Sequence, residues 1–229
     1  MNSSKSGTFF FECGNSRCGL RLPLDTELFD GRYCPRCGSP LERHEPGILA
    51  QKPPAAPSPN FRIIGALDNI RSAHNVGAIF RTADGAGLSE LLLGGITPTP
   101  TEQPAISKTA LGAENTITWS YHPNLPKTLA ERKADNCLIL ALEYAHGAVS
   151  LRELQINHPF PGQIILVAGN EPTGVDPAIL RIADQVLYIP MNGEKSSLNV
   201  SVAFGIAVFQ LLALLFTQKK ALAVPTPFN

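Results

Sequence analysis

The segment from Ile189 to Phe216 constrains the fold of this chain more than any other, and it reads IPMNGEKSSLNVSVAFGIAVFQLLALLF. A polar loop at 191–199 leads directly into an almost uninterrupted apolar run at 200–216. That run only reaches the lower limit of about 17–25 residues for a membrane span, and no aromatic belt flanks it. We therefore predict a helix that is buried on several sides, in a core and a subunit interface, rather than a membrane span. The polar loop before it is predicted to form part of a binding site.

Composition indicates a soluble globular protein, because 44% of its 229 residues are hydrophobic and 17% are charged. Lys plus Arg equals Asp plus Glu, at 19 each, so bulk charge does not predict a nucleic-acid partner. The start, MNSSKSGTFFFECG, lacks an apolar segment long enough for a secretory signal. We therefore predict a cytoplasmic protein with reduced cysteines.

Four cysteines near the start form two close pairs with the spacing of a tetrahedral metal site. The pairs are C-x4-C and C-x2-C, and the residues are Cys13, Cys18, Cys34 and Cys37. Four thiolates leave no open coordination position, so we predict a structural Zn²⁺ in a zinc ribbon at 1–45; the alternative is a redox pair with two core thiols. Six basic and six acidic residues balance within this ribbon, so its charge alone does not support RNA contact by Arg17, Arg21 and Arg36.

The remaining chain predicts an α/β domain at 61–217, after a proline-rich linker at 46–60 and before a C-terminal tail at 218–229. Near-continuous apolar runs alternate with helical patterns, which is typical of a mostly parallel sheet. The predicted strands are 61–67, 90–95, 137–142, 163–169 and 185–190, with a further short strand around Trp119 and Tyr121. The predicted helices are 76–86, 125–135, 177–183 and 200–216.

Three loops that follow predicted strands carry the residues able to do chemistry. The first leads into a small-residue helix that is predicted to carry Arg81 inward, although a solvated surface charge is the alternative. The second, AGNEPTGVD, presents Glu171 and is otherwise an ordinary strand-to-helix turn or a weak phosphate loop. The third supplies Asn192, Ser196, Ser197 and Asn199, and Asn199 is also suited to cap the following helix. No H-E-x-x-H or G-x-S-x-G pattern is present, which disfavours metal-dependent and serine hydrolases.

Together the three loops resemble motifs 1, 2 and 3 of the SpoU (TrmH-type) branch of the SPOUT RNA methyltransferases. The matching sequences are N-V-G-A-I-F-R-T-A-D from Asn75, G-N-E-x-x-G from Gly169, and I-P-M-x-G-x-x-x-S-L-N-V-S-V-A from Ile189. One departure is Pro172, where the family more often carries glycine, and it is expected to stiffen the second loop.

The resemblance implies a SPOUT-type α/β domain with a mostly parallel sheet and a C-terminal trefoil knot, a feature that general topology rules would not have proposed. It implies S-adenosylmethionine as cofactor, and the expected contacts are Leu142, Gly169, Ile189 and Leu198. It also implies a homodimer formed through 200–216. The implied reaction is methyl transfer to a ribose 2′-hydroxyl of tRNA or rRNA.

The family's catalytic positions correspond to Arg81, Asn75, Glu171, Ser197 and Asn199. We expect Arg81 to anchor the target phosphate and stabilise the developing alkoxide, because its guanidinium stays protonated. Asn75 and Glu171 are expected to orient Arg81 and the loops, and Ser197 and Asn199 to shape the site.

The charge of the predicted domain is the main difficulty for RNA binding, because 61–217 contains ten basic and thirteen acidic residues. RNA binding then requires a local basic face, expected from Arg71, Arg81, Lys108 and Lys195. Two alternatives remain open: a non-catalytic RNA-binding or assembly protein with the same fold, and a zinc-ribbon module fused to a nucleotide-binding α/β domain.

Overall fold

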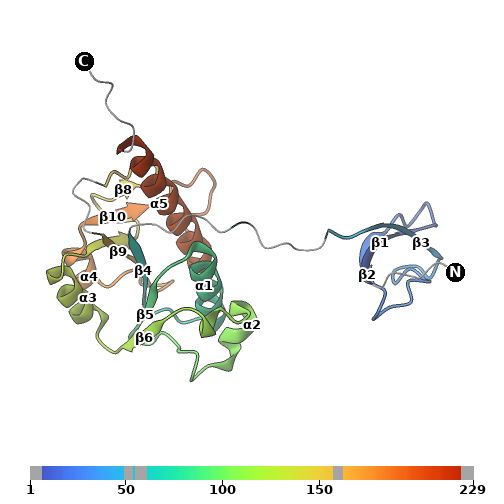
Figure 1. Cartoon of the computed structure of the whole chain (residues 1–229), viewed down its shortest axis with the longest axis horizontal. Helices are drawn as coiled ribbons and strands as arrows, with labels where there is room; N and C mark the ends of the chain where they lie inside the picture. Colours follow the sequence, from blue (N-terminus) through green and yellow to red (C-terminus); the bar gives the residue numbers. More distant parts are fainter. Residues whose placement is uncertain (1–6, 49–53, 55–60, 157–161, 223–229) are drawn as a thin grey trace, which may run out of the picture. The chain divides into compact units, whose positions relative to one another are not determined.

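The computed structural model describes residues 7–48, 54, 61–156 and 162–222, with side chains as far as Thr217. The chain forms two compact units, 1–57 and 58–229, which are described separately (Figure 1). Most of the predicted linker at 46–60 and most of the predicted tail at 218–229 lie outside the described residues.

The N-terminal unit is a three-stranded antiparallel sheet with the order β2-β1-β3. Its strands are β1 (Thr8–Cys13), β2 (Arg21–Asp25) and β3 (Leu41–Pro46). Among its described residues only Phe11, Cys13 and Cys34 are buried hydrophobic residues. So small a core contributes little burial energy, which is why a unit of this size depends on a metal or another cross-link.

The second unit contains a seven-stranded sheet with the order β6-β5-β4-β9-β7-β10-β8, and every neighbouring pair is parallel. The mostly parallel sheet of the sequence prediction is confirmed. Its strands are β4 (Arg62–Asp68), β5 (Glu90–Gly94), β6 (Trp119–His122), β7 (Leu138–Leu142), β8 (Val149–Ser150), β9 (Gln163–Ala168) and β10 (Gln185–Tyr188). Its helices are α1 (Ala73–Ala86), α2 (Ser107–Ala110), α3 (Leu125–Ala134), α4 (Pro177–Ile182) and α5 (Val200–Leu222), with 3₁₀ turns η1 (Pro104–Ile106) and η2 (Ala113–Asn115).

Helices cover both faces of this sheet, so its central strands are apolar at successive positions. Along β4, Ile63 and Leu67 pack with α1 and α5, whereas Ile64 packs with α3 and α4. Glycine is required at position 65 of the same strand, because a Cβ there would overlap the side chains of Leu91 and Phe204. The close approach of α5 to β4 therefore depends on that glycine.

Helix α5 begins at Val200, as predicted, but continues past the predicted end to Leu222 and lies alongside α1 (Figure 1). One side of it, including Phe204, Val208 and Leu211, belongs to the core. It is the one helix in the described part of the chain that is long and apolar enough to cross a membrane. The apolar stretch is Val200–Thr217, and 33% of it is buried in this structure. The remaining apolar surface is available for a partner.

The predicted strands and helices all occur, with boundaries that differ by a few residues. The two-residue strand β8 and the four-residue helix α2 were not predicted. Both are too short to show a hydrophobic period, and each is held by its neighbours: β8 pairs with β10, and α2 packs on α1.

Candidate functional site

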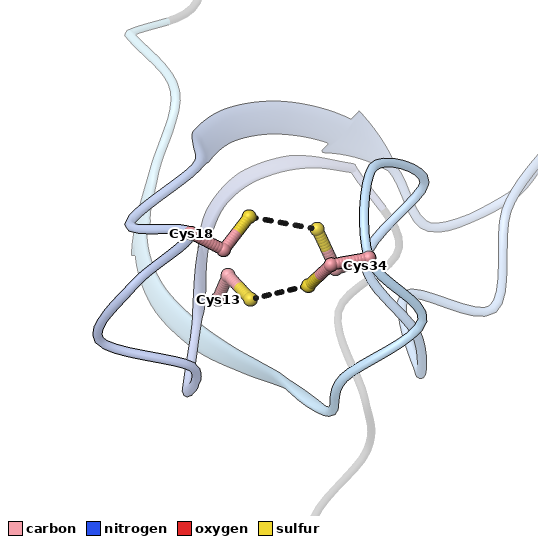
Figure 2. A group of neighbouring side chains, drawn as sticks. Cys13, Cys18 and Cys34 are labelled. Atoms are coloured by element: carbon pink, nitrogen blue, oxygen red, sulfur yellow. Dashed lines mark hydrogen bonds between the residues drawn. The ribbon is translucent and has the colours of Figure 1, made fainter.

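The four predicted metal ligands come together in the N-terminal unit, where their sulfur atoms lie within 4.8 Å of one another. Cys13 Sγ lies 3.4 Å from Cys37 Sγ, and Cys18 Sγ lies 3.8 Å from Cys34 Sγ (Figure 2). Tetrahedral zinc with Zn–S bonds of about 2.3 Å separates its sulfurs by about 3.8 Å, and a disulfide would hold them near 2.05 Å. The spacing therefore fits four ligands of one metal ion and excludes disulfides in this structure.

The pKa of one of these thiols, Cys37, is lowered by its neighbours. Hydrogen bonds from the Ser39 hydroxyl and then from its backbone N–H lower the pKa of Cys37 to about 6. The thiolate is the form that binds a metal. Against a hydrogen bond from the Asn15 backbone, the pKa of Cys13 is raised to about 12 by burial and the neighbouring thiols, so Cys37 ionises more readily than Cys13.

The second unit contains a cavity of about 940 Å³ at the carboxyl ends of its strands. Three segments line it: the end of β7 with the two residues after it, the loop after β9, and the long segment from the end of β10 to the start of α5. The predicted cofactor contacts Leu142, Gly169, Ile189 and Leu198 all line the cavity. Ligands bind at this edge in open α/β sheets, and the volume suits a small-molecule ligand.

A chain of hydrogen bonds joins the three predicted motifs beside this cavity. Asn75 Nδ2 donates to Glu171 Oε1 at 2.7 Å, and Asn199 Nδ2 donates to Asn75 Oδ1 at 3.0 Å. Asn75 lies in the first turn of α1, Glu171 in the loop after β9, and Asn199 directly before α5. Three of the five predicted catalytic residues are thus in one network, and a fourth, Ser197, lines the cavity.

Asn199 caps α5, as considered, and also contacts the first motif. Its Oδ1 accepts hydrogen bonds from Ser201 N at 2.9 Å and Ser201 Oγ at 2.6 Å, which caps the first turn of α5. The same amide group donates to Asn75. Capping therefore fixes the orientation in which this residue reaches the other motifs.

Arg81 does not lie where the sequence predicted, because its side chain is exposed on α1 rather than carried inward. In the described part of the chain it makes no hydrogen bond or ion pair, so Asn75 and Glu171 do not orient it within one chain. Asn75 and Arg81 are six positions apart, and at about 100° per residue they lie on different sides of α1. The inward packing was inferred from its neighbours in the helix, of which Ile79 and Ala83 face the core, whereas Arg81 faces away.

Sequence reasoning missed the polar residues that hold the second loop in place. Glu143 Oε2 accepts from Val175 N at 3.0 Å, and Asn170 Nδ2 donates to Asn69 O at 2.6 Å. Asp68, at the end of β4, accepts from Asp176 N at 2.7 Å. Burial raises the pKa of the Asp68 carboxyl, with hydrogen bonds from Asp176 and Asn69 acting in the opposite direction.

The signal that could have found Glu143 and Asp68 was their position directly after or at the end of a buried strand. The loop that they support is tightly closed, since Asn170 and Gly174 exchange two backbone hydrogen bonds around Pro172. A Cβ at Gly169 would overlap the backbone of Gly174 and Val175, so glycine is required there.

A parallel sheet with helices on both faces and a loop-built cavity at its carboxyl edge is an open α/β architecture, and solved SPOUT-type structures of the SpoU/TrmH kind resemble the chain. The Aquifex aeolicus TrmH/SpoU tRNA modifying enzyme is 30% identical, with a TM-score of 0.60, and the match covers 69% of this chain and 77% of that one. An AdoMet-bound rRNA methyltransferase from Sinorhizobium meliloti is 28% identical, with a TM-score of 0.59, over 67% of this chain and 59% of that one.

The profile of the SpoU rRNA Methylase family matches residues 62–209. The chain therefore belongs to the SpoU rRNA methylase family. A curated relative, the 23S rRNA (guanosine-2'-O-)-methyltransferase RlmB of Acinetobacter baylyi, is 32% identical over 151 residues. That match covers 63% of this chain and 57% of the relative, so the chain spans less than two thirds of the relative's length.

Proposed function

We propose that this chain transfers a methyl group from S-adenosylmethionine to a ribose 2′-hydroxyl of tRNA or rRNA. The observation that carries the proposal is the Asn75–Glu171–Asn199 network, which joins all three family motifs beside the cavity. The relatives support both kinds of RNA, because the Acinetobacter protein is named for 23S rRNA and the Aquifex protein for tRNA.

The cavity suits a cationic nucleoside cofactor such as S-adenosylmethionine. Its lining contains three carboxylates, Glu143, Glu171 and Glu194, against one lysine, Lys195. This excess of negative charge favours a sulfonium cation. The Sinorhizobium neighbour, solved with AdoMet bound, supports the same cofactor. The predicted trefoil knot around the cofactor site remains part of this proposal.

Catalysis requires that the ribose hydroxyl be held in line with the methyl group and lose its proton as the bond forms. When bound, S-adenosylmethionine supplies the electrophilic methyl and leaves as a neutral thioether. Ser197 shapes the site at the cavity, and the Asn75–Glu171–Asn199 network fixes the relative positions of the three loops. Arg81 is exposed, and its guanidinium group is suited to bind a target phosphate and stabilise negative charge on the ribose oxygen.

RNA binding by this unit is supported by basic residues on segments that meet at the first turn of α1. Arg71 precedes that turn, and Lys195 lies in the segment that Asn199 ties to Asn75. Lys108 lies in α2, where the neighbouring Thr109 donates to His74 O at 2.9 Å. All three are exposed. A local basic face can therefore form despite the net negative charge of the unit.

The chain is further proposed to be a homodimer formed through α5. Val202, Ile206 and Phe209 are 50%, 42% and 53% exposed, and their spacing places them on one side of the helix. An apolar stripe of this kind is costly to leave in water and suits a second copy of the same helix. The dimer, rather than a membrane, then accounts for the apolarity of this helix, in keeping with a cytoplasmic enzyme.

Replacing Phe209 with glutamate is expected to convert the dimer to a monomer, because it buries charge in an apolar interface. Sedimentation velocity with the full chain measures the mass directly. Ile96→Glu, which places the same charge at an exposed apolar residue outside α5, is the matched control and should leave the dimer intact. A wild-type chain that sediments as a monomer, or that requires detergent to remain in solution, would contradict the proposed interface.

The function itself is tested by mapping 2′-O-methylation in total RNA from cells with and without the gene, together with methyl transfer by the purified chain. The expected result is one or more ribose methyl groups that disappear without the gene and are restored by the protein in vitro. RNA binding without any methyl transfer would indicate a non-catalytic assembly protein instead. Binding of ATP or NAD without S-adenosylmethionine binding would indicate the nucleotide-binding alternative.

A further inference from the structure

The charges of the N-terminal unit are separated along its sequence. Segments 14–24 and 31–41, which contain three of the four cysteines, carry four arginines and no acidic residue. All six acidic residues of 1–45 lie outside these segments. The balanced total therefore combines two arginine-bearing segments around the cysteine turns, where four thiolates on one Zn²⁺ would add two negative charges, with acidic residues that lie elsewhere in 1–45.

The structure shows which of these arginines are available to a partner. Arg21 lies on β2 and is already neutralised, with its Nη1 2.9 Å from Glu12 Oε2 and its Nη2 3.0 Å from Glu45 Oε2. The side chains of Arg17 and Arg36 are exposed and form no hydrogen bond or ion pair within the described residues, although the backbone N–H of Arg17 donates to Asn15 Oδ1 at 3.0 Å. The Arg32 side chain makes a long 3.7 Å ion pair with Asp30, and both side chains are largely exposed; the Arg32 backbone N–H also donates to Asp30 Oδ1 at 3.1 Å.

Arg17 and Arg36 occupy equivalent places in the two cysteine turns. Each directly precedes the second cysteine of its pair, Cys18 or Cys37. The turns are closed by backbone hydrogen bonds, from Cys18 N to Asn15 O at 2.8 Å and from Gly38 N to Cys34 O at 2.9 Å. Because all four sulfurs lie within 4.8 Å, the two turns meet at the cluster (Figure 2).

An exposed aromatic ring lies in the same region. Tyr33 directly precedes Cys34, and it is 66% exposed although its backbone bridges Pro40. Arginines that bind phosphates, next to an aromatic ring on which a base can stack, are the combination used to hold single-stranded nucleic acid. Phe29 is also exposed, at 59%, but it lies in a segment that contains Asp25, Glu27 and Asp30.

We propose that the cysteine-cluster end of the N-terminal unit, formed by Arg17, Arg32, Tyr33 and Arg36, binds unpaired RNA. The arginines contact backbone phosphates and Tyr33 stacks on a base. This inference rests on the proposed RNA methyltransferase function and adds to it a second RNA-binding surface. That surface binds RNA regardless of sequence and supplies positive charge that the net-negative second unit lacks.

Two variants of the full chain test this surface. Arg17→Gln combined with Arg36→Gln is expected to weaken binding of a short, unstructured, fluorescein-labelled RNA roughly tenfold at low salt. The slope of log K against log [KCl] should also fall by about 1.4, since each single-strand phosphate contact contributes about 0.7. Tyr33→Ala is expected to weaken the same binding roughly tenfold with little change in the slope, and Tyr33→Phe should restore it.

Two matched controls remove residues of the same kinds that lie outside the proposed surface. Arg21→Gln removes an arginine that is already paired, and Phe29→Ala removes an exposed aromatic ring from an acidic segment. Both should leave RNA affinity unchanged. Bound zinc per chain, measured for every variant, reports whether the unit has folded. If the double arginine variant loses zinc, the comparison of Tyr33→Ala with Tyr33→Phe decides the question.

Two outcomes would overturn the proposal. One is wild-type RNA affinity and salt slope in both test variants, which would leave this end of the unit to a protein partner. The other is an equal loss in the test and control variants. Methyl transfer to bulk RNA by the wild-type chain is measured in parallel. If transfer occurs while the variants match the wild type, only the second RNA surface is wrong; if no transfer occurs, the proposed function itself fails.

Discussion

Replacing Arg81 with alanine is expected to lower methyl transfer by about 10²–10³-fold while leaving S-adenosylmethionine affinity within about twofold. The side chain is exposed, has no polar partner within the described residues, and does not line the cavity. Its removal therefore disturbs neither the fold nor the cofactor site. What is lost is a cation that binds the target phosphate and stabilises charge on the ribose oxygen.

Single-turnover methyl transfer to RNA, combined with calorimetric titration of the cofactor, separates these two effects. Arg181→Ala is the matched control, since Arg181 is an exposed arginine on α4, outside the cavity lining. Arg81→Lys should retain part of the activity if charge is what matters, and less if a planar two-point contact with phosphate is required. Undiminished transfer by the alanine variant would exclude Arg81 from catalysis.

Removing the zinc predicted at the four-cysteine cluster is expected to unfold the N-terminal unit and leave the second unit intact. Structural zinc contributes an apparent binding free energy of about 10–16 kcal/mol, far more than the few buried residues of this unit can replace. We expect Cys34→Ser, or strong chelation under reducing conditions, to abolish hydrogen-exchange protection in β1, β2 and β3. Thermal unfolding of the second unit and its affinity for S-adenosylmethionine should not change, because that unit has its own core.

The fifth cysteine provides the control for this experiment. Cys137 is buried in the second unit, with its sulfur 3.2 Å from Gln163 Oε1, and is remote in sequence from the cluster. Cys137→Ser should keep one zinc per chain and full protection in the N-terminal unit. Strands that stay protected in the metal-free chain would show that the ribbon folds without zinc.

Local sequence patterns predicted most of the elements and the segments that line the cavity. The apolar runs at β4, β5, β7 and β9 are buried on both faces, and such runs are visible without any knowledge of their neighbours. Leu142, Gly169, Ile189 and Leu198 were placed through the family motifs, and all of them line the cavity. The cysteine spacing predicted the cluster because four closely spaced ligands need little long-range information.

The strand order and the polar contacts between loops were beyond the reach of those patterns. Nothing in the sequence of β9 indicates that it lies between β4 and β7, because all three strands are uniformly apolar. The hydrogen bonds from Asn75 to Glu171 and from Asn199 to Asn75 join residues 96 and 124 positions apart. Such contacts exist only once the sheet has brought the ends of separate strands to one edge.

The sequence by itself determined that this chain carries a four-cysteine cluster, an α/β unit, and three motifs of the SpoU family. The tertiary structure decided how those parts are used. It placed Arg81 on the outside of α1 and divided α5 into a core side and an exposed apolar side. It also separated the paired Arg21 from the unpaired Arg17 and Arg36. The periodicity of apolar residues predicts the helix or strand in which a residue lies. Its exposure and its polar partners depend on segments that are distant in the chain.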